Sequence, residues 1–94
     1  MTTQYIQPTP EKRQELLKIA GESERLVKDQ ERKTITTISR TQTWKKEKEG
    51  THPLRKKLST NSVCWLLSDL LYFIYQQPTE KTQIKHSINK IHND

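Results

Sequence analysis

Apolar residues gather in one stretch of the chain, Val63 to Tyr75 (VCWLLSDLLYFIY), and the segments on either side are mostly charged or small and polar. This pattern predicts the end of a strand followed by a helix, and we expect the two to supply the core of a small domain. The stretch does not predict a membrane span, which needs about 20 apolar residues without a charge such as Asp69. The expected core residues are Val63, Trp65, Leu70, Phe73 and Ile74.

The helix expected within this stretch, Leu66 to Tyr75, is apolar around nearly its whole circumference. In a small domain such a helix has a second apolar face, and we expect this face to be buried against another element or protein. Three covers remain open: another subunit in a homodimer, the segment Glu11 to Ala20, or a partner protein such as a recombinase or polymerase. The second face consists of Leu66, Leu67, Leu71, Tyr72 and Tyr75.

The segments that flank this domain are polar. We expect Met1 to Pro10 to be a disordered lead, and it lacks the basic start and the apolar stretch of a signal peptide. Glu11 to Ala20 predicts a short helix that ends at Gly21, and this helix would pack on the domain, pair with a second copy or fray. The pattern divides the chain into a flexible lead with one short helix (1–24), a domain (25–77) and a polar tail, frayed or disordered (78–94).

The N-terminal part of the expected domain, residues 25–38, contains few apolar residues. Leu26-Val27 predicts a short strand, and Asp29 to Ile35 predicts a helix with an acidic residue at its positive end. The inward candidates are only Leu26, Ile35 and Ile38, so we expect a domain of modest stability.

A second helix is delimited by clear local signals. Ser39 and Gln42 have the spacing of a capping box, in which both side chains satisfy free backbone N–H groups at a helix start. Gly50 can adopt the left-handed conformation that ends a helix, and Pro53 prevents continuation. These signals predict a helix from Arg40 to Glu49.

One face of this helix is basic, aromatic and hydroxylated. Cationic side chains can pair with phosphates or with guanine edges, and the major groove of DNA admits one helix. The alternative is a solvated helix with scattered lysines, and the helix alone does not decide between the two. The residues of this face are Arg40, Thr41, Trp44, Lys45 and Lys48.

Two short segments after the helix, Leu54 to Leu58 and Asn61 to Trp65, are compatible with a hairpin whose turn contains Ser59 and Thr60. The hairpin would project a basic ribbon beside the helix, and its natural use is contact with a phosphate backbone. The basic residues of the ribbon are Arg55, Lys56 and Lys57.

The net charge of +6 is concentrated on these elements. Between Arg25 and Leu58, Lys and Arg outnumber Asp and Glu by 11 to 4, whereas the remaining segments carry no excess of positive charge. Confinement of the charge to one helix and its ribbon favours a polyanionic partner.

The segment Arg25 to Gln77 combines several short motifs without a gap, among them Arg25-Leu26, Ile38-Ser39-Arg40, Lys48-Glu49-Gly50, Lys57-Leu58-Ser59, Asn61-Ser62-Val63 and Ser68-Asp69. In this combination it resembles the AlpA-type prophage regulators, small winged helix-turn-helix proteins related to phage excisionases and to the DNA-binding domain of MerR-like regulators. The resemblance implies DNA binding by the second helix of the motif and by the wing. It also implies control of an integrase gene or of prophage excision.

The sequence departs from the family pattern at four positions. Thr37 replaces the usual glycine of the helix-turn-helix turn, and a β-branched residue tolerates left-handed backbone poorly. Thr43 replaces an aliphatic residue, and Asp29 and Arg32 replace residues that are commonly apolar. We therefore expect the first two helices to bury less apolar surface than is usual in the family.

Residues for chemistry other than binding are sparse. Cys64 is the only cysteine, and we expect it to be a small buried residue. His52, His86 and His92 lack the spacing of a zinc site, and His52 is expected to be an ordinary turn residue. We therefore expect no enzyme activity, no metal or other cofactor and no small-molecule ligand.

The sequence thus predicts a mainly α-helical winged helix-turn-helix domain with a small β-hairpin. The expected function is a sequence-specific regulator that binds double-stranded DNA in the bacterial cytoplasm, associated with the nucleoid. Two alternatives remain: a protein-interaction module that uses helix 66–75 and binds nucleic acid only non-specifically, and a remnant that no longer folds. The expected DNA-binding residues are Ser39, Arg40, Thr41, Gln42, Trp44, Lys45, Lys48, Arg55, Lys56 and Lys57.

Overall fold

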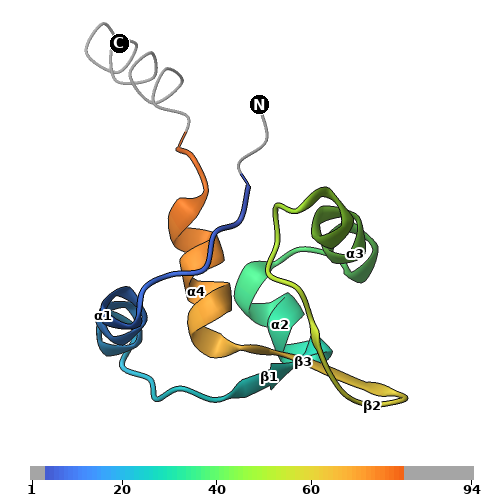
Figure 1. Ribbon diagram of the computed structural model, residues 1–94, viewed down its shortest axis with the longest axis horizontal. Coiled ribbons are helices and arrows are strands. Elements are labelled where there is room, and N and C mark those ends of the chain that lie inside the picture. Colours follow the sequence, from blue (N-terminus) through green and yellow to red (C-terminus); the bar gives the residue numbers. More distant parts are fainter. Residues whose placement is uncertain (1–3, 80–94) are drawn as a thin grey trace, which may run out of the picture.

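A helix-turn-helix pair and a small antiparallel sheet form the centre of the structure, a computed structural model that describes residues 4–79 (Figure 1). This is the winged helix-turn-helix arrangement that the sequence predicts: α2 and α3 are the motif, and β2 and β3 are the wing. The elements in chain order are α1 (Pro10–Ala20), β1 (Leu26–Lys28), α2 (Asp29–Thr36), α3 (Arg40–Glu49), β2 (Lys56–Ser59), β3 (Ser62–Leu66) and α4 (Leu67–Gln76).

The sheet has three strands in the order β1-β3-β2, so β1 extends the expected hairpin by pairing with β3, on the side away from β2. Val27 lies opposite Trp65, and both side chains are on the inner face with at most 1% of their surface exposed. Because side chains alternate along a strand, Leu26 faces the other way and is 47% exposed. The prediction that Leu26 points inward was therefore wrong by one position.

The core lies between the inner face of this sheet and helices α1 and α4. Its buried cluster contains Trp65 and Leu70, as predicted, and Phe73 is buried beside it. Val63 is half-buried and packs against this cluster, whereas Ile74 is 41% exposed, so its prediction as a core residue was wrong. The cluster is completed by Leu17, Val27 and Leu67.

Helix α1 covers the second face of α4. Leu16 and Leu17 are buried in this contact, so of the three expected covers the structure contains the α1 segment. Arg13 of α1 donates hydrogen bonds to Ser68 Oγ (2.7 Å) and Asp69 Oδ1 (2.9 Å) in the first turn of α4. The start of α4 is thus held by charged side chains from the preceding part of the chain.

The segment Gln4–Thr9 crosses α4 and reaches the end of α3, which differs from the disordered lead expected from its polar composition (Figure 1). The backbone N–H of Tyr5 donates to Gly50 O (2.8 Å), and its hydroxyl donates to Asp69 Oδ1 (2.6 Å). The Tyr5 ring packs edge-on against Tyr72, with 6.2 Å between the ring centroids. Burial and the hydrogen bond to Asp69 raise the pKa of Tyr5 far above its ordinary value. Pro8 is buried and the Gln4 side chain donates to Glu49 O, so Tyr5 is the main but not the sole anchor of this segment.

The tail after Thr79 lies outside the described residues, so its predicted fraying or disorder remains a prediction. Among the helices of residues 4–79, none has the length and apolar character needed to cross a membrane.

We predict that Tyr5→Phe lowers the free energy of unfolding by about 1 to 2 kcal/mol, because it removes a hydrogen bond to a carboxylate and retains the ring contact. Urea unfolding followed by circular dichroism measures the change. Ile6→Ala is the matched control, since Ile6 is 68% exposed and its truncation should change stability little. Equal stability of Tyr5→Phe and the wild type would show that the hydrogen bond from Tyr5 to Asp69 does not contribute to stability.

Candidate nucleic-acid interface

The turn between α2 and α3 keeps left-handed geometry at Thr37. Its φ is 63°, and its backbone N–H donates to Lys33 O (2.8 Å), which closes the end of α2. A β-branched residue in this conformation is strained by about 1 to 2 kcal/mol. The structure thus places a threonine in the geometry that a glycine would adopt freely, and surrounding contacts hold it there.

Arg32 provides these contacts. Its guanidinium is buried, and it donates to Asp29 Oδ1 (2.9 Å) at the start of α2 and to Ile38 O (2.8 Å) just past the turn. It also lies over the Trp65 ring, 5.6 Å from the centroid. The polar residues at positions 29 and 32 therefore do more than reduce the apolar core: they tie both ends of α2 and the following turn into one hydrogen-bonded unit.

Helix α3 has the predicted bounds. Ser39 Oγ accepts a hydrogen bond from the backbone N–H of Gln42 (3.1 Å), so the Ser39 half of the predicted capping box is confirmed, whereas the Gln42 side chain does not return a bond to Ser39. Gly50 adopts a φ of 80° and ends the helix. Thr43 faces inward and is fully buried, and its hydroxyl donates to Ser39 O (2.9 Å). A hydroxyl thus occupies the buried position where the resemblance led us to expect an aliphatic side chain.

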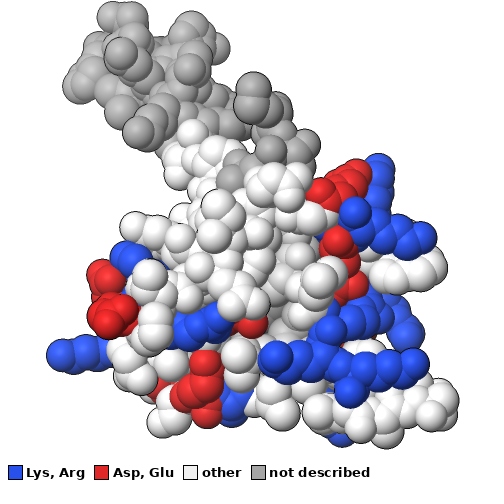
Figure 2. All heavy atoms as spheres, in the orientation of Figure 1, with Lys and Arg blue, Asp and Glu red and all other residues white. Residues whose placement is uncertain are grey.

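The outer face of α3 is exposed and cationic, and Lys and Arg gather over α3 and the wing (Figure 2). Trp44 is 56% exposed, and the ammonium of Lys48 lies 4.2 Å from the centroid of its ring. A shallow hollow at this face is lined by Arg40, Thr41, Trp44 and Arg55. The predicted face is therefore assembled as one surface, and all its members are exposed: Arg40, Thr41, Trp44, Lys45 and Lys48.

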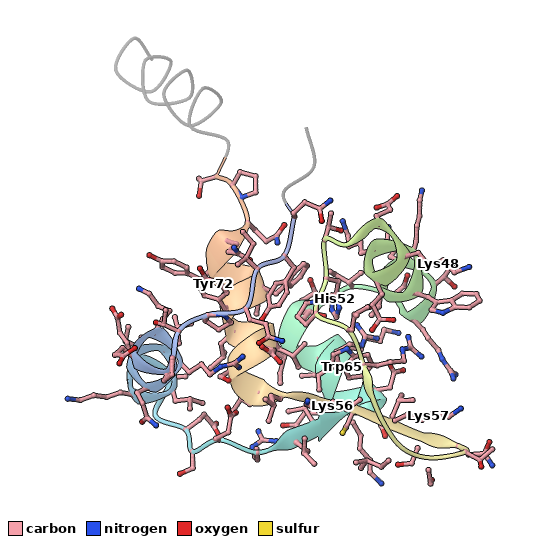
Figure 3. All side chains as sticks on the ribbon, in the orientation of Figure 1. Lys48, His52, Lys56, Lys57, Trp65 and Tyr72 are labelled. Atoms are coloured by element: carbon pink, nitrogen blue, oxygen red, sulfur yellow. The ribbon has the colours of Figure 1, made fainter. Side chains whose placement is uncertain are left out.

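On the wing, Lys56 and Lys57 are exposed. Lys57 lies opposite Val63 in the ladder, which places it on the face of the sheet that Trp65 also occupies. Lys48 and Lys57 extend from the surface at the α3 and wing side, whereas His52 and Trp65 lie inside the domain (Figure 3). The wing thus adds Lys57 beside the cations of α3, while Lys56, opposite Cys64, lies on the other face of the sheet.

Arg55 differs from the other predicted contact residues because it belongs to a buried cluster. Its Nε donates to Glu47 Oε1 (2.9 Å), and its guanidinium lies 5.5 Å from the centroid of the Trp65 ring. Glu47 is buried on the inner face of α3, and its Oε2 accepts from Trp65 Nε1 (3.0 Å). Sequence reasoning missed Glu47; its only signal is the i, i+4 spacing to Thr43 opposite the basic face.

His52 is an interior residue and not the ordinary turn residue that its position before a proline suggested. Its ring has 1% exposure and lies 4.7 Å from the Phe73 ring centroid, and its Nδ1 is 2.8 Å from Pro53 O. Burial and the nearby positive charges, above all Arg32 and Arg55, lower the pKa of His52 to about 4, although the Pro53 carbonyl acts against them. His52 is therefore neutral at pH 7 and serves as a packed core residue. Within residues 4–79, no group of three His, Cys, Asp or Glu side chains could hold a metal ion.

We predict that Glu47→Ala lowers the free energy of unfolding by about 2 to 4 kcal/mol, since it leaves Arg55 without its carboxylate and removes an acceptor from a buried indole N–H. Thermal melting monitored by circular dichroism measures the loss. Glu49→Ala, an exposed acidic residue of the same helix, is the control and should stay within about 0.5 kcal/mol of the wild type. Similar melting of both variants would contradict a structural role for Glu47.

Stability should also depend on pH through His52. The folded-state pKa, about 4, lies below the ordinary value of 6.5, so the unfolded chain binds the proton first as the pH falls. The free energy of unfolding should therefore decrease from about pH 7 to pH 4, by about 1 to 3 kcal/mol from this group.

His52→Gln removes this titration and provides the comparison. Urea unfolding of both proteins at several pH values is the test. As the pH falls, the wild type should lose more free energy of unfolding than His52→Gln does. The carboxylates titrate in both proteins and cancel in this difference. A difference that stays constant from pH 7 to pH 4 would contradict the prediction.

Comparison with known proteins agrees with this geometry. No curated protein and no solved structure matches the chain. The family described as Prophage CP4-57 regulatory protein (AlpA) matches residues 25–77, which is more than half of the 94 residues. The matched region runs from the residue before β1 to the end of α4 and contains the helix-turn-helix and the wing. The chain therefore belongs to the AlpA family of prophage regulatory proteins.

Proposed function

We propose that this protein is a sequence-specific regulator that binds double-stranded DNA and controls integrase expression or excision of a prophage or other integrated element. The observation that supports this proposal is the exposed cationic and aromatic face of α3, with the lysines of the wing on the same side of the domain (Figure 2). Membership of a prophage regulatory family supports the regulatory role.

The arrangement fits a helix in the major groove with the wing beside it. In helix-turn-helix proteins the first residues of the second helix contact base edges, and Arg40 and Thr41 hold these positions in α3. An arginine can bond to a guanine edge with two N–H groups, and the exposed Trp44 ring can contact a thymine methyl group. Lys45 would follow them into the groove, and phosphates would contact Lys48, Lys56 and Lys57.

Specific reading also requires that α3 keeps one orientation. The Glu47 carboxylate joins α3 to Trp65 of β3 and to Arg55, and the Ser39 cap fixes the first turn. Arg55 contributes mainly through this cluster, while the part of its side chain that lines the hollow adds positive charge near Arg40. Such supporting contacts hold base-reading side chains in place before DNA arrives.

The rival function, a protein-interaction module that uses helix 66–75, has less support. Helix α1 already covers part of the second face of α4 through Leu16 and Leu17, and Leu67 of that face is buried. The large apolar side chains of α4 that remain exposed are Ile74 and Tyr75, a small area for an interface. In the proposed function no bond is made or broken; the protein acts by its position on DNA, where it recruits or blocks polymerase or shapes the site for a recombinase.

We predict that Arg40→Ala weakens binding by about 1 to 3 kcal/mol on the preferred DNA and relaxes the preference at one base pair, since Arg40 would read a base edge. Lys57→Ala should weaken binding to all sequences alike and reduce the slope of log K against log salt by about one unit, as expected for a phosphate contact.

Fluorescence anisotropy tests both, with labelled DNA from upstream of the gene and scrambled DNA, from about 50 to 200 mM salt. Lys18→Ala on α1, at the opposite side of the domain from α3, is the control and should bind as the wild type does (Figure 1). If the wild type binds both DNAs equally at every salt concentration, the protein is not a sequence-specific regulator of this site. If Arg40→Ala and Lys57→Ala lose affinity equally on both DNAs, the division between base and phosphate contacts is wrong.

A further inference from the structure

Leu58 is an apolar side chain of the wing that the core does not use. In the β2–β3 ladder Lys57 lies opposite Val63, but Ser59 lies opposite Ser62, so Leu58 is the extra residue of a bulge. A bulged residue has no partner across the ladder, and its side chain leaves the regular alternation of the strand. The side chain of Leu58 is 55% exposed. The wing therefore presents a leucine at the one place where its strand is irregular.

The surroundings of Leu58 favour nucleic acid as its partner. Lys56 and Lys57 precede it; Ser59 at the end of β2 and the turn Thr60-Asn61 offer only hydroxyl and amide side chains, all exposed. The sequence contains no Asp or Glu between Gly50 and Ser68, so the wing carries only positive charge. Cations suit a phosphate backbone, and amide side chains suit the acceptors in the minor groove. Duplex nucleic acid fits this combination, because its phosphate backbone is anionic and the space between its stacked bases is apolar.

We propose that the wing enters the minor groove beside the major-groove segment read by α3, and that Leu58 inserts between two base pairs, unstacks them and bends the DNA. This inference rests on the proposed DNA-binding function and assigns a role to a residue outside the predicted contact set. Apolar side chains, leucine among them, act in this way in minor-groove proteins, and burial of the side chain offsets part of the unstacking. The kinked step should be a flexible pyrimidine–purine step, where deformation is easiest.

The test uses the full chain and a DNA site selected from a random library. 2-Aminopurine placed at successive positions reports unstacking as a rise in fluorescence, and energy transfer between dyes at the two DNA ends reports bending. With the wild type we expect a rise at one step and a shorter end-to-end distance. Leu58→Ser should remove both signals and weaken binding about tenfold, the loss expected when a leucine is no longer buried.

Two further variants separate the role of Leu58 from general effects. Leu58→Met keeps an apolar side chain and should restore both signals. Ile19→Ser removes another exposed aliphatic side chain, on α1, which is 75% exposed, and should behave as the wild type. Since Leu58 is exposed, Leu58→Ser should melt at the wild-type temperature. If it melts lower, the signals of Leu58→Met show whether the apolar side chain is required.

Three outcomes would overturn the inference. If the wild type binds its selected site without unstacking any step, the wedge is absent while the proposed function stands. If Leu58→Ser changes the sedimentation of the free protein, and not the DNA signals, Leu58 belongs to a protein interface. If the library yields no preferred site at all, the proposed function and the inference fall together.

Discussion

The hydrogen bond from the Trp65 indole to the Glu47 carboxylate connects the two halves of the domain. Trp65 is the central residue of the sheet core, and Glu47 is the buried charged residue of a helix whose other inward side chain is Thr43. Arg55 binds the second carboxylate oxygen and lies beside the Trp65 ring, so the negative charge has a partner inside the protein. Without this contact α3 would offer the core little, because its residues are almost all polar. The orientation of the basic face therefore depends on one acid.

Polar groups do much of the packing elsewhere in the domain as well. Arg32, Thr43 and His52 are fully or almost fully buried, and each is hydrogen-bonded at least once. A buried polar group is favourable only when it is hydrogen-bonded, and such bonds require particular distances and directions. Such a core is less tolerant of rearrangement than an aliphatic one of equal size. The low hydrophobic content of 30% is thus compatible with a defined structure.

Local signals in the sequence predicted the helices and strands well, but contacts between residues far apart in the chain could not be predicted from it. Ser39 and Gly50 fixed the bounds of α3, because a cap acts within one turn of its own residue. The three-residue strand β1 was too short for its alternation to show whether Leu26 or Val27 faces inward. The DNA contacts of the basic face remain predictions, although the structure assembles that face.

Interior roles for Glu47, His52 and Tyr5 could not be predicted from neighbouring residues. The partners Trp65, Phe73 and Asp69 lie far along the chain, and only the fold brings them close. A charged or polar residue gives no local sign that a distant side chain will satisfy it. The sequence therefore predicts outward surfaces of a small domain better than its polar interior.

The order of the strands has a consequence for synthesis of the chain. The central strand β3 and helix α4 come last among the described elements, yet β1 pairs with β3 and α1 packs on α4. While a ribosome makes the first 60 residues, neither early element has its neighbour, and contacts between distant segments form slowly. The domain can close only after α4 has left the exit tunnel. Competence for any partner thus requires that nearly the whole described chain, through α4, has already been made.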